Sequence, residues 1–183
     1  MRLFSALTLP PSWHRLLAEV QALLQAKYPQ GIRWSRVENL HLTVRFIGEV
    51  DDSRARELIA TWSSLRLPPE LPVLELTTCG TFPDEGPERI VWAGAQAQRG
   101  AWLPLVQYID SVLSNFAIEP VIADPVLHIT LGRIRNPALV RGLRESVSGI
   151  RLSDVALGVD SVGLFSSVPS SAGSAYTLVA TMR

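Results

Sequence analysis

The chain has 183 residues, with 17 basic and 17 acidic side chains, so its formal net charge at pH 7 is zero. A neutral chain has no global field that draws it to nucleic acid or to an anionic membrane, so any contact with a polyanion must be local. With 47% hydrophobic residues the chain can bury a substantial core. We expect residues 1–183 to form a single domain made of two lobes.

The cysteine count and the absence of long apolar runs exclude several classes of protein. Cys79 is the only cysteine, so an intramolecular disulfide and a zinc ribbon are both excluded, and a reducing cytoplasm is the expected location. No apolar run approaches the roughly 20 residues that a membrane span requires. We interpret the opening MRLFSALTL as a strand rather than a signal peptide. No Gly-Lys-Ser/Thr sequence is present, which argues against a Walker-type nucleotide hydrolase. We expect a monomer.

The first half of the chain predicts strands alternating with two amphipathic helices. A strand over 2–9 is followed by Pro10-Pro11 and a helical apolar stripe that ends near Leu24. Strands are then expected at 32–34 and at 40–48. Asp51 and its neighbours offer an N-cap for a second helix, whose apolar residues lie between 55 and 62.

The second half predicts more strands in adjacent pairs. Runs 73–82 and 89–95 indicate a hairpin, and a third helix is expected over 103–116. A strand over 126–134 precedes a fourth helix, opened by Asn136-Pro137 and apolar as far as Val147. Closing strands are expected at 155–165 and 176–182. Adjacent strands broken by helices indicate the α+β class with mainly antiparallel sheet and flanking helices, and we expect a cleft between two related lobes.

Two strands carry one short pattern, Leu-His-aliphatic-Thr-aliphatic, at 40–44 and again at 127–131. Side chains alternate between the two faces of a strand, so His41 and Thr43 share one face, and His128 and Thr130 share one face of the second strand. The aliphatic residues belong to a core. If the two strands lie side by side or face each other, they place two imidazoles and two hydroxyls around one point.

Two imidazoles across a cleft suit acid–base chemistry at a phosphodiester. One can take a proton from a nucleophile while the other gives a proton to the leaving oxygen, and the threonine hydroxyls can donate hydrogen bonds to the phosphate. Arginine pairs well with phosphate. Strand alternation places Arg45 on the face of His41 and Arg133 on the face opposite His128, unless the second strand bends at Gly132.

Other interpretations of the histidines are less favoured. A metal site is disfavoured because His-x-Thr is not a ligand spacing and no local motif supplies a third ligand. A serine hydrolase is disfavoured because residues 158–163 do not match the Gly-x-Ser-x-Gly turn. His14 lies off its helical stripe and is read as a surface residue. Trp34 and Phe82 are candidates for stacking a nucleobase, although large aromatic residues are more often core.

The two motifs resemble those of the 2H phosphoesterases, and HLTVRFIGEV with HITLGR is similar to the RNA 2′,3′-cyclic phosphodiesterase family, also called the 2′-5′ RNA ligase family. The resemblance extends to the opening RLF-x-AL, to IRW, GTFP and VWAG, and to LF and YTLV near the end. Two departures are Leu127, where the family often has proline, and Ser5, where an aliphatic residue is usual. Neither departure removes a chemical group.

This resemblance implies a bilobal α+β fold and hydrolysis of 2′,3′-cyclic phosphate ends of RNA or nucleotides to a 2′-phosphate, with no metal or other cofactor. His41 would be the proton donor and His128 the proton acceptor, while Thr43, Thr130 and Arg133 would bind the phosphate. Two alternatives remain open. One is 2′-5′ ligation, which is the reverse reaction at the same groups, and the other is a non-catalytic module that binds RNA ends.

Overall fold

The computed structural model describes residues 1–97, 102–120, 126–152, 156–169 and 174–183. The helices are α1 (Pro11–Lys27), α2 (Asp52–Ser64), α3 (Trp102–Ser114) and α4 (Leu143–Ser148), with short 3₁₀ turns η1 (Val37–Asn39) and η2 (Pro137–Leu139). The strands are β1 (Arg2–Thr8), β2 (Ile32–Trp34), β3 (His41–Glu49), β4 (Val73–Phe82), β5 (Ile90–Ala97), β6 (His128–Ile134), β7 (Leu157–Gly158), β8 (Val162–Val168) and β9 (Ala175–Met182).

The described strands form one curled antiparallel sheet, which confirms the predicted α+β class. The order across the sheet is β7-β4-β5-β6-β3-β1-β8-β9, and β2 also pairs with β6. The two motif strands, β3 and β6, are therefore neighbours at the centre of the sheet. Their register pairs Leu42 with Ile129, and each motif strand has three further strands on its outer side.

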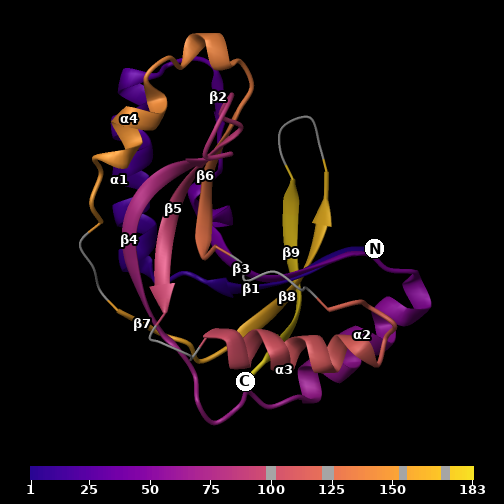
Figure 1. Ribbon diagram of the computed structural model, residues 1–183. Helices are drawn as coiled ribbons and strands as arrows, with labels where there is room; N and C mark the ends of the chain where they lie inside the picture. Colours follow the sequence, from indigo (N-terminus) through magenta and orange to yellow (C-terminus); the bar gives the residue numbers. More distant parts are fainter. Residues whose placement is uncertain (98–101, 121–125, 153–155, 170–173) are drawn as a thin grey trace.

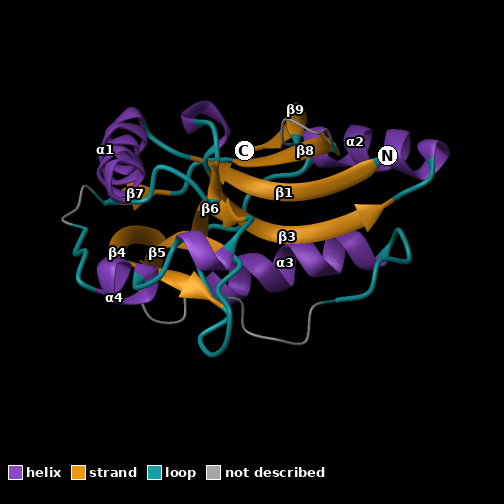
Figure 2. Ribbon diagram, turned by 90° about the horizontal axis from the view of Figure 1, so that it is seen from above, coloured by secondary structure: helices purple, strands orange, loops and turns teal. Residues whose placement is uncertain are grey.

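The helices cover the two halves of the sheet separately. Figure 1 shows α1 and α4 beside the half that contains β4, β5 and β6, and α2 and α3 below the half that contains β1, β3 and β8. In the view from above, α3 runs alongside β3 (Figure 2). Most of the apolar stripe residues predicted for these helices are buried, whereas Leu23 of α1 is 63% exposed. Leu17 of α1, Leu58 of α2 and Leu105 of α3 are all fully inaccessible. Burying each such side chain stabilises the fold by about 1.5–3 kcal/mol.

Two predicted elements are broken in the structure. The expected fourth helix is divided into η2 and α4, because Gly142 adopts a left-handed conformation with φ of 74° at the N-cap of α4. The expected strand over 155–165 is divided into β7 and β8, and its first residue, Val155, lies outside the described residues. Among the helices that the structure describes, none is long and apolar enough to cross a membrane.

Candidate active site

A cavity of about 780 Å³ opens where β3 meets β6. His41 and Thr43 line it from β3, and His128 and Thr130 line it from β6. The pairing of Leu42 with Ile129 explains this meeting, because the residues on either side of those two project from the opposite face of the sheet. Leu42 and Ile129 themselves are fully buried. The structure thus brings both His-x-Thr motifs to one cavity.

Both histidine rings are held in the same way. The Nδ1 atom of His41 lies 2.7 Å from the carbonyl oxygen of Asn39, and the Nδ1 atom of His128 lies 2.8 Å from the carbonyl oxygen of Val126. A carbonyl oxygen can only accept a hydrogen bond, so each Nδ1 carries a hydrogen atom. Each Nε2 is therefore the ring nitrogen that remains for proton transfer.

Each histidine ring also meets the edge or face of an aromatic ring. The ring centroids of His41 and Tyr176 are 5.1 Å apart at an interplanar angle of 85°, and Phe4 lies 5.0 Å from His41 on a neighbouring strand. The Phe82 ring is 5.1 Å from His128 at 89°. Together with the Nδ1 hydrogen bonds, these contacts fix the orientation of the two imidazoles.

Burial lowers the pKa of His41 below its ordinary value, because removing the imidazolium from water disfavours the charged form. The hydrogen bond to the Asn39 carbonyl opposes this effect, and the charge of His128 lowers the pKa of His41 further. The two rings are therefore close enough to interact electrostatically. In the free protein, the neutral form of His41 is favoured, and a bound phosphate anion would favour its protonated form.

The prediction that Arg45 shares the face of His41 is wrong, because β3 contains a β-bulge. Along β1, Ser5 pairs with Arg45 and Ala6 pairs with Thr43, so Val44 has no partner. The extra residue reverses the alternation beyond it. Arg45 points away from the cavity, is only 7% exposed, and its Nε donates to Oδ1 of Asp110 at 2.6 Å.

The same bulge carries Phe46 to the cavity, where its side chain is 64% exposed. Strict strand alternation from His41 would place Phe46 on the opposite face, with Leu42 in the core. The guanidinium of Arg45 instead donates to the carbonyl oxygens of Phe46 and Glu119, in addition to Asp110. Arg45 is thus a structural residue that holds the bulge, and a role for it in phosphate binding is not proposed further.

A second bulge, at the equivalent position of β6, brings Arg133 into the cavity. Val91 pairs with Gly132 and Trp92 pairs with Thr130, so Leu131 has no partner on β5. Leu131 and Val44 each stand three residues after the motif histidine. Strict alternation would turn Arg133 away from His128, but the irregularity before Gly132 is the exception that was allowed for, and Arg133 is an exposed residue that lines the cavity.

A buried glutamine holds this second bulge. The Nε2 atom of Gln21, a residue of α1 that is 3% exposed, donates to the carbonyl oxygens of Leu131 and Ser35, both at 2.9 Å. Ser35 in turn donates its hydroxyl to the carbonyl oxygen of Thr130 at 2.8 Å. These bonds tie β2 and α1 to the part of β6 that presents Thr130 and Arg133.

The two candidates for base stacking are placed differently. Trp34 lines the cavity, whereas Phe82 packs against Trp92 and the edge of His128.

Cys79 is buried, which raises the pKa of its thiol to about 12, so it is no nucleophile at neutral pH. Within the described ranges, no group of three or more His, Cys, Asp or Glu side chains could hold a metal ion.

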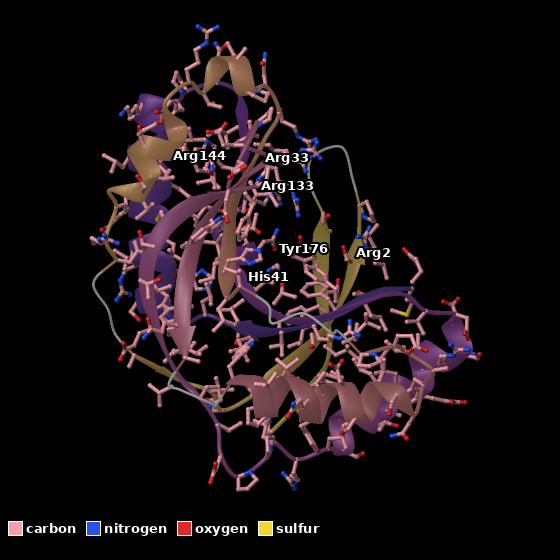
Figure 3. The ribbon with its side chains drawn as sticks, in the orientation of Figure 1. Arg2, Arg33, His41, Arg133, Arg144 and Tyr176 are labelled. Carbon is pink, nitrogen blue, oxygen red and sulfur yellow. The ribbon has the colours of Figure 1, made fainter. Side chains whose placement is uncertain are left out.

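Sequence reasoning missed three arginines that line the same cavity, which are Arg2, Arg33 and Arg36. Arg33 is the register partner of Arg133 on the neighbouring strand. Figure 3 shows these two side chains together, with His41 and Tyr176 below them. Sixteen of the chain's seventeen basic residues are arginine, so no arginine outside the two motif strands stood out in the sequence.

An α+β fold that sets two His-x-Thr strands side by side at one cavity defines the 2H phosphoesterase class. The protein-family model described as "LigT like Phosphoesterase" matches residues 7–92 and 95–176. The chain therefore belongs to the LigT-like phosphoesterase family, which confirms the family resemblance of its motifs.

Curated relatives agree with this assignment. The chain is 32% identical over 136 residues to the RNA 2′,3′-cyclic phosphodiesterase of Methanocaldococcus jannaschii, a match that covers 74% of this chain and 72% of the relative. It is 33% identical over 146 residues to the protein of the same name from Aeropyrum pernix, covering 76% and 78% of the two chains.

Solved structures agree as well. The crystal structure of the Thermus thermophilus protein TT0787 matches with a TM-score of 0.81 and 26% identity, and covers 100% of this chain and 97% of that one. Escherichia coli LigT complexed with 3′-AMP matches with a TM-score of 0.65 and 22% identity, covering 98% of this chain and 95% of that one. At that identity, LigT supports the fold alone.

Proposed function

We propose that this phosphoesterase hydrolyses 2′,3′-cyclic phosphate ends of RNA or nucleotides and leaves a 2′-phosphate. The observation that carries the proposal is the matched anchoring of His41 and His128, whose Nδ1 atoms are occupied and whose Nε2 atoms remain for proton transfer at one cavity. The names of the archaeal relatives support this choice of substrate.

In the proposed reaction, Nε2 of His128 accepts a proton from a water molecule whose oxygen forms a bond to phosphorus. The bond between phosphorus and O3′ breaks, and His41 gives its proton to O3′. The 2′-phosphate leaves, and proton exchange with solvent restores both rings. Each positioned proton transfer typically contributes about 10²–10⁴-fold to the rate. Because His41 is favoured as neutral in the free protein, we propose that the bound phosphate anion promotes its protonation.

Thr43, Thr130 and Arg133 would hold the phosphate in this reaction. The two hydroxyls can donate hydrogen bonds to its non-bridging oxygens, and the guanidinium can offset the negative charge that develops on them. We propose that the reaction needs no metal ion or other cofactor, since these groups can supply both proton transfer and charge stabilisation.

The active unit is proposed to be one copy of residues 1–183 in the cytoplasm. Each half of the sheet supplies one histidine and one threonine to the cavity, so neither half would be active alone. Size-exclusion chromatography with light scattering is expected to give the mass of a single 20.1 kDa chain. A dimeric mass would contradict the monomer.

The direct test is incubation of the protein with a nucleoside 2′,3′-cyclic phosphate in excess EDTA, followed by ³¹P NMR of the product. We expect a nucleoside 2′-phosphate as the sole product. Formation of the 3′-phosphate would refute the assignment of the leaving oxygen, and loss of turnover in EDTA would refute independence from metal. Tight binding without turnover, with or without EDTA, would identify a binding module instead.

The alternative reaction, 2′-5′ ligation, uses the same groups, with an RNA 5′-hydroxyl in place of water as the nucleophile. Water is in large excess over any RNA hydroxyl, so hydrolysis is expected to predominate at equilibrium. Cleaved tRNA halves with a 2′,3′-cyclic phosphate end provide the comparison, and mainly joined product at equilibrium would favour ligation over the proposed hydrolysis.

A further inference from the structure

The charge of the active-site cavity differs from that of the whole chain. Arg2, Arg33, Arg36 and Arg133 line it, and Glu38 is the one acidic residue among its described lining. The chain as a whole has zero net charge. A concave surface on which one sign of charge predominates concentrates the field, so this cavity attracts anions although the protein as a whole does not.

Two of these arginines face each other across neighbouring strands. Arg33 on β2 is the direct register partner of Arg133 on β6, and both line the cavity (Figure 3). Like charges directly opposite each other on a sheet destabilise it. Negative charge bound near either guanidinium group weakens this repulsion, so the pairing is compatible with a site that binds phosphates.

One reacting phosphate does not account for all of this charge. Arg133 stands three residues after Thr130 on β6, beyond the bulge, and it is the arginine assigned above to the reacting phosphate. Arg33 belongs to β2, and Arg36 precedes η1, so both come from the chain segment before β3. A cavity of about 780 Å³ is also far larger than one phosphate, and lies in the range of about 300–1,000 Å³ that holds drug-sized ligands.

We propose that Arg33 and Arg36 form a second phosphate subsite, which binds the internucleotide phosphate on the 5′ side of the terminal nucleotide. This inference rests on the proposed function, because an RNA with a 2′,3′-cyclic end carries its next anionic group on O5′ of that nucleotide. Guanidinium groups suit such a phosphate through charge-assisted hydrogen bonds. The enzyme would then be selective for oligonucleotide ends over free cyclic nucleotides.

Three substrates isolate the charge of this phosphate. They are a nucleoside 2′,3′-cyclic phosphate, a dinucleotide with the same cyclic end, and that dinucleotide with a neutral methylphosphonate linkage. We expect kcat/KM for the normal dinucleotide to exceed the other two by about tenfold or more, as expected for one charge-assisted hydrogen bond. The advantage should shrink between about 0.05 and 0.5 M salt, because the Debye length falls to a few Å near the upper value.

Variants then locate the subsite. We expect Arg36→Ala and Arg33→Ala to remove most of the advantage of the normal dinucleotide, and Arg36→Lys to retain part of it. Arg56→Ala on α2 is the matched control for loss of one positive charge outside the cavity, and should keep the advantage. Circular dichroism should show that all four variants fold.

Several outcomes would overturn the subsite. Equal kcat/KM for the normal and methylphosphonate dinucleotides would exclude recognition of the internucleotide charge. Equal losses on the mononucleotide and the dinucleotide in Arg33→Ala would assign that residue to the reacting phosphate instead. Failure of the wild-type protein to turn over any cyclic substrate would refute the proposed function itself. A failure of the subsite alone would leave turnover of the cyclic substrates intact, so the two results can be told apart.

Discussion

Replacement of Asp110 by alanine tests the buried ion pair that holds the bulge of β3. Asp110 is 9% exposed and Arg45 is 7% exposed, and their Oδ1 and Nε atoms are 2.6 Å apart. Removing one partner of a buried pair costs about 3–5 kcal/mol, because the other charge is left without compensation. In Asp110→Ala the Arg45 guanidinium still donates hydrogen bonds to the carbonyl oxygens of Phe46 and Glu119. We therefore expect the free energy of unfolding to fall by an amount near the lower limit, about 3 kcal/mol.

Urea denaturation followed by circular dichroism measures this loss as a change in the free energy of unfolding. A domain of this size loses about 2–4 °C in Tm per kcal/mol, so Tm should fall by about 6–12 °C. Asp84→Ala, at an exposed position, is the control and should change the free energy by less than about 0.5 kcal/mol. The double variant Arg45→Met/Asp110→Leu should recover most of the stability, because no buried charge remains. A loss below about 1 kcal/mol in Asp110→Ala would refute the reasoning.

Three further predictions concern catalysis. Because burial lowers the pKa of His41, its role as proton donor predicts that kcat/KM falls as pH rises through a value below about 6.5, whereas kcat falls at higher pH because the bound anion favours the protonated ring. A rise of kcat/KM with pH that disappears in His41→Ala would make His41 the base. Gln21→Ala should lower stability by about 1–3 kcal/mol and lower kcat/KM, because the Ser35 carbonyl loses its side-chain donor, the Leu131 carbonyl keeps only the Ser35 amide, and Arg133 loses its positioning. Unchanged kcat/KM in this variant would exclude the positioning role. Thr130→Val should lower kcat/KM by about 10–100-fold with little effect on folding, and a change under about threefold would remove Thr130 from the site.

The sequence predicted the α+β class and most of the elements, because the spacing of apolar residues and the positions of turn-forming residues are local signals. Loose alternation identified β1, two strand-like runs around a turn identified β4 and β5, and the helical stripe after Pro10-Pro11 identified α1. The division of the expected fourth helix was missed because it depends on the left-handed conformation of Gly142, which helical spacing of apolar residues does not reveal.

The faces of Arg45 and Arg133 could not be predicted, because strand alternation assumes that no residue is inserted. Each motif strand has a bulge three residues after its histidine, and each bulge is held from another element, by Asp110 of α3 or by Gln21 of α1. The partners of the first contact are 65 positions apart in the chain, and those of the second are 110 positions apart. No local pattern in the sequence predicts them.

The hydrogen bonds that hold the two histidine rings could not be predicted from local sequence patterns either. The carbonyl groups that accept from Nδ1 belong to Asn39 and Val126, each two residues before its histidine. Every residue type has a backbone carbonyl, so the side chains at these positions reveal nothing. Whether the carbonyl oxygen reaches Nδ1 depends on the course of the backbone before each strand. The repeated motif indicated which side chains meet, and the structure supplied the nitrogen that each ring leaves for chemistry.

The most direct test of the account is whether both imidazoles serve the same phosphorus atom. Steady-state kinetics on a nucleoside 2′,3′-cyclic phosphate should be measured in EDTA for His41→Ala, His128→Ala and the double variant. We predict a loss in kcat of about 10²-fold or more for each single variant, and a loss for the double variant well below the product of the two, because residues that act in one step are not additive. Activity within about tenfold of wild type in either folded single variant would contradict the account.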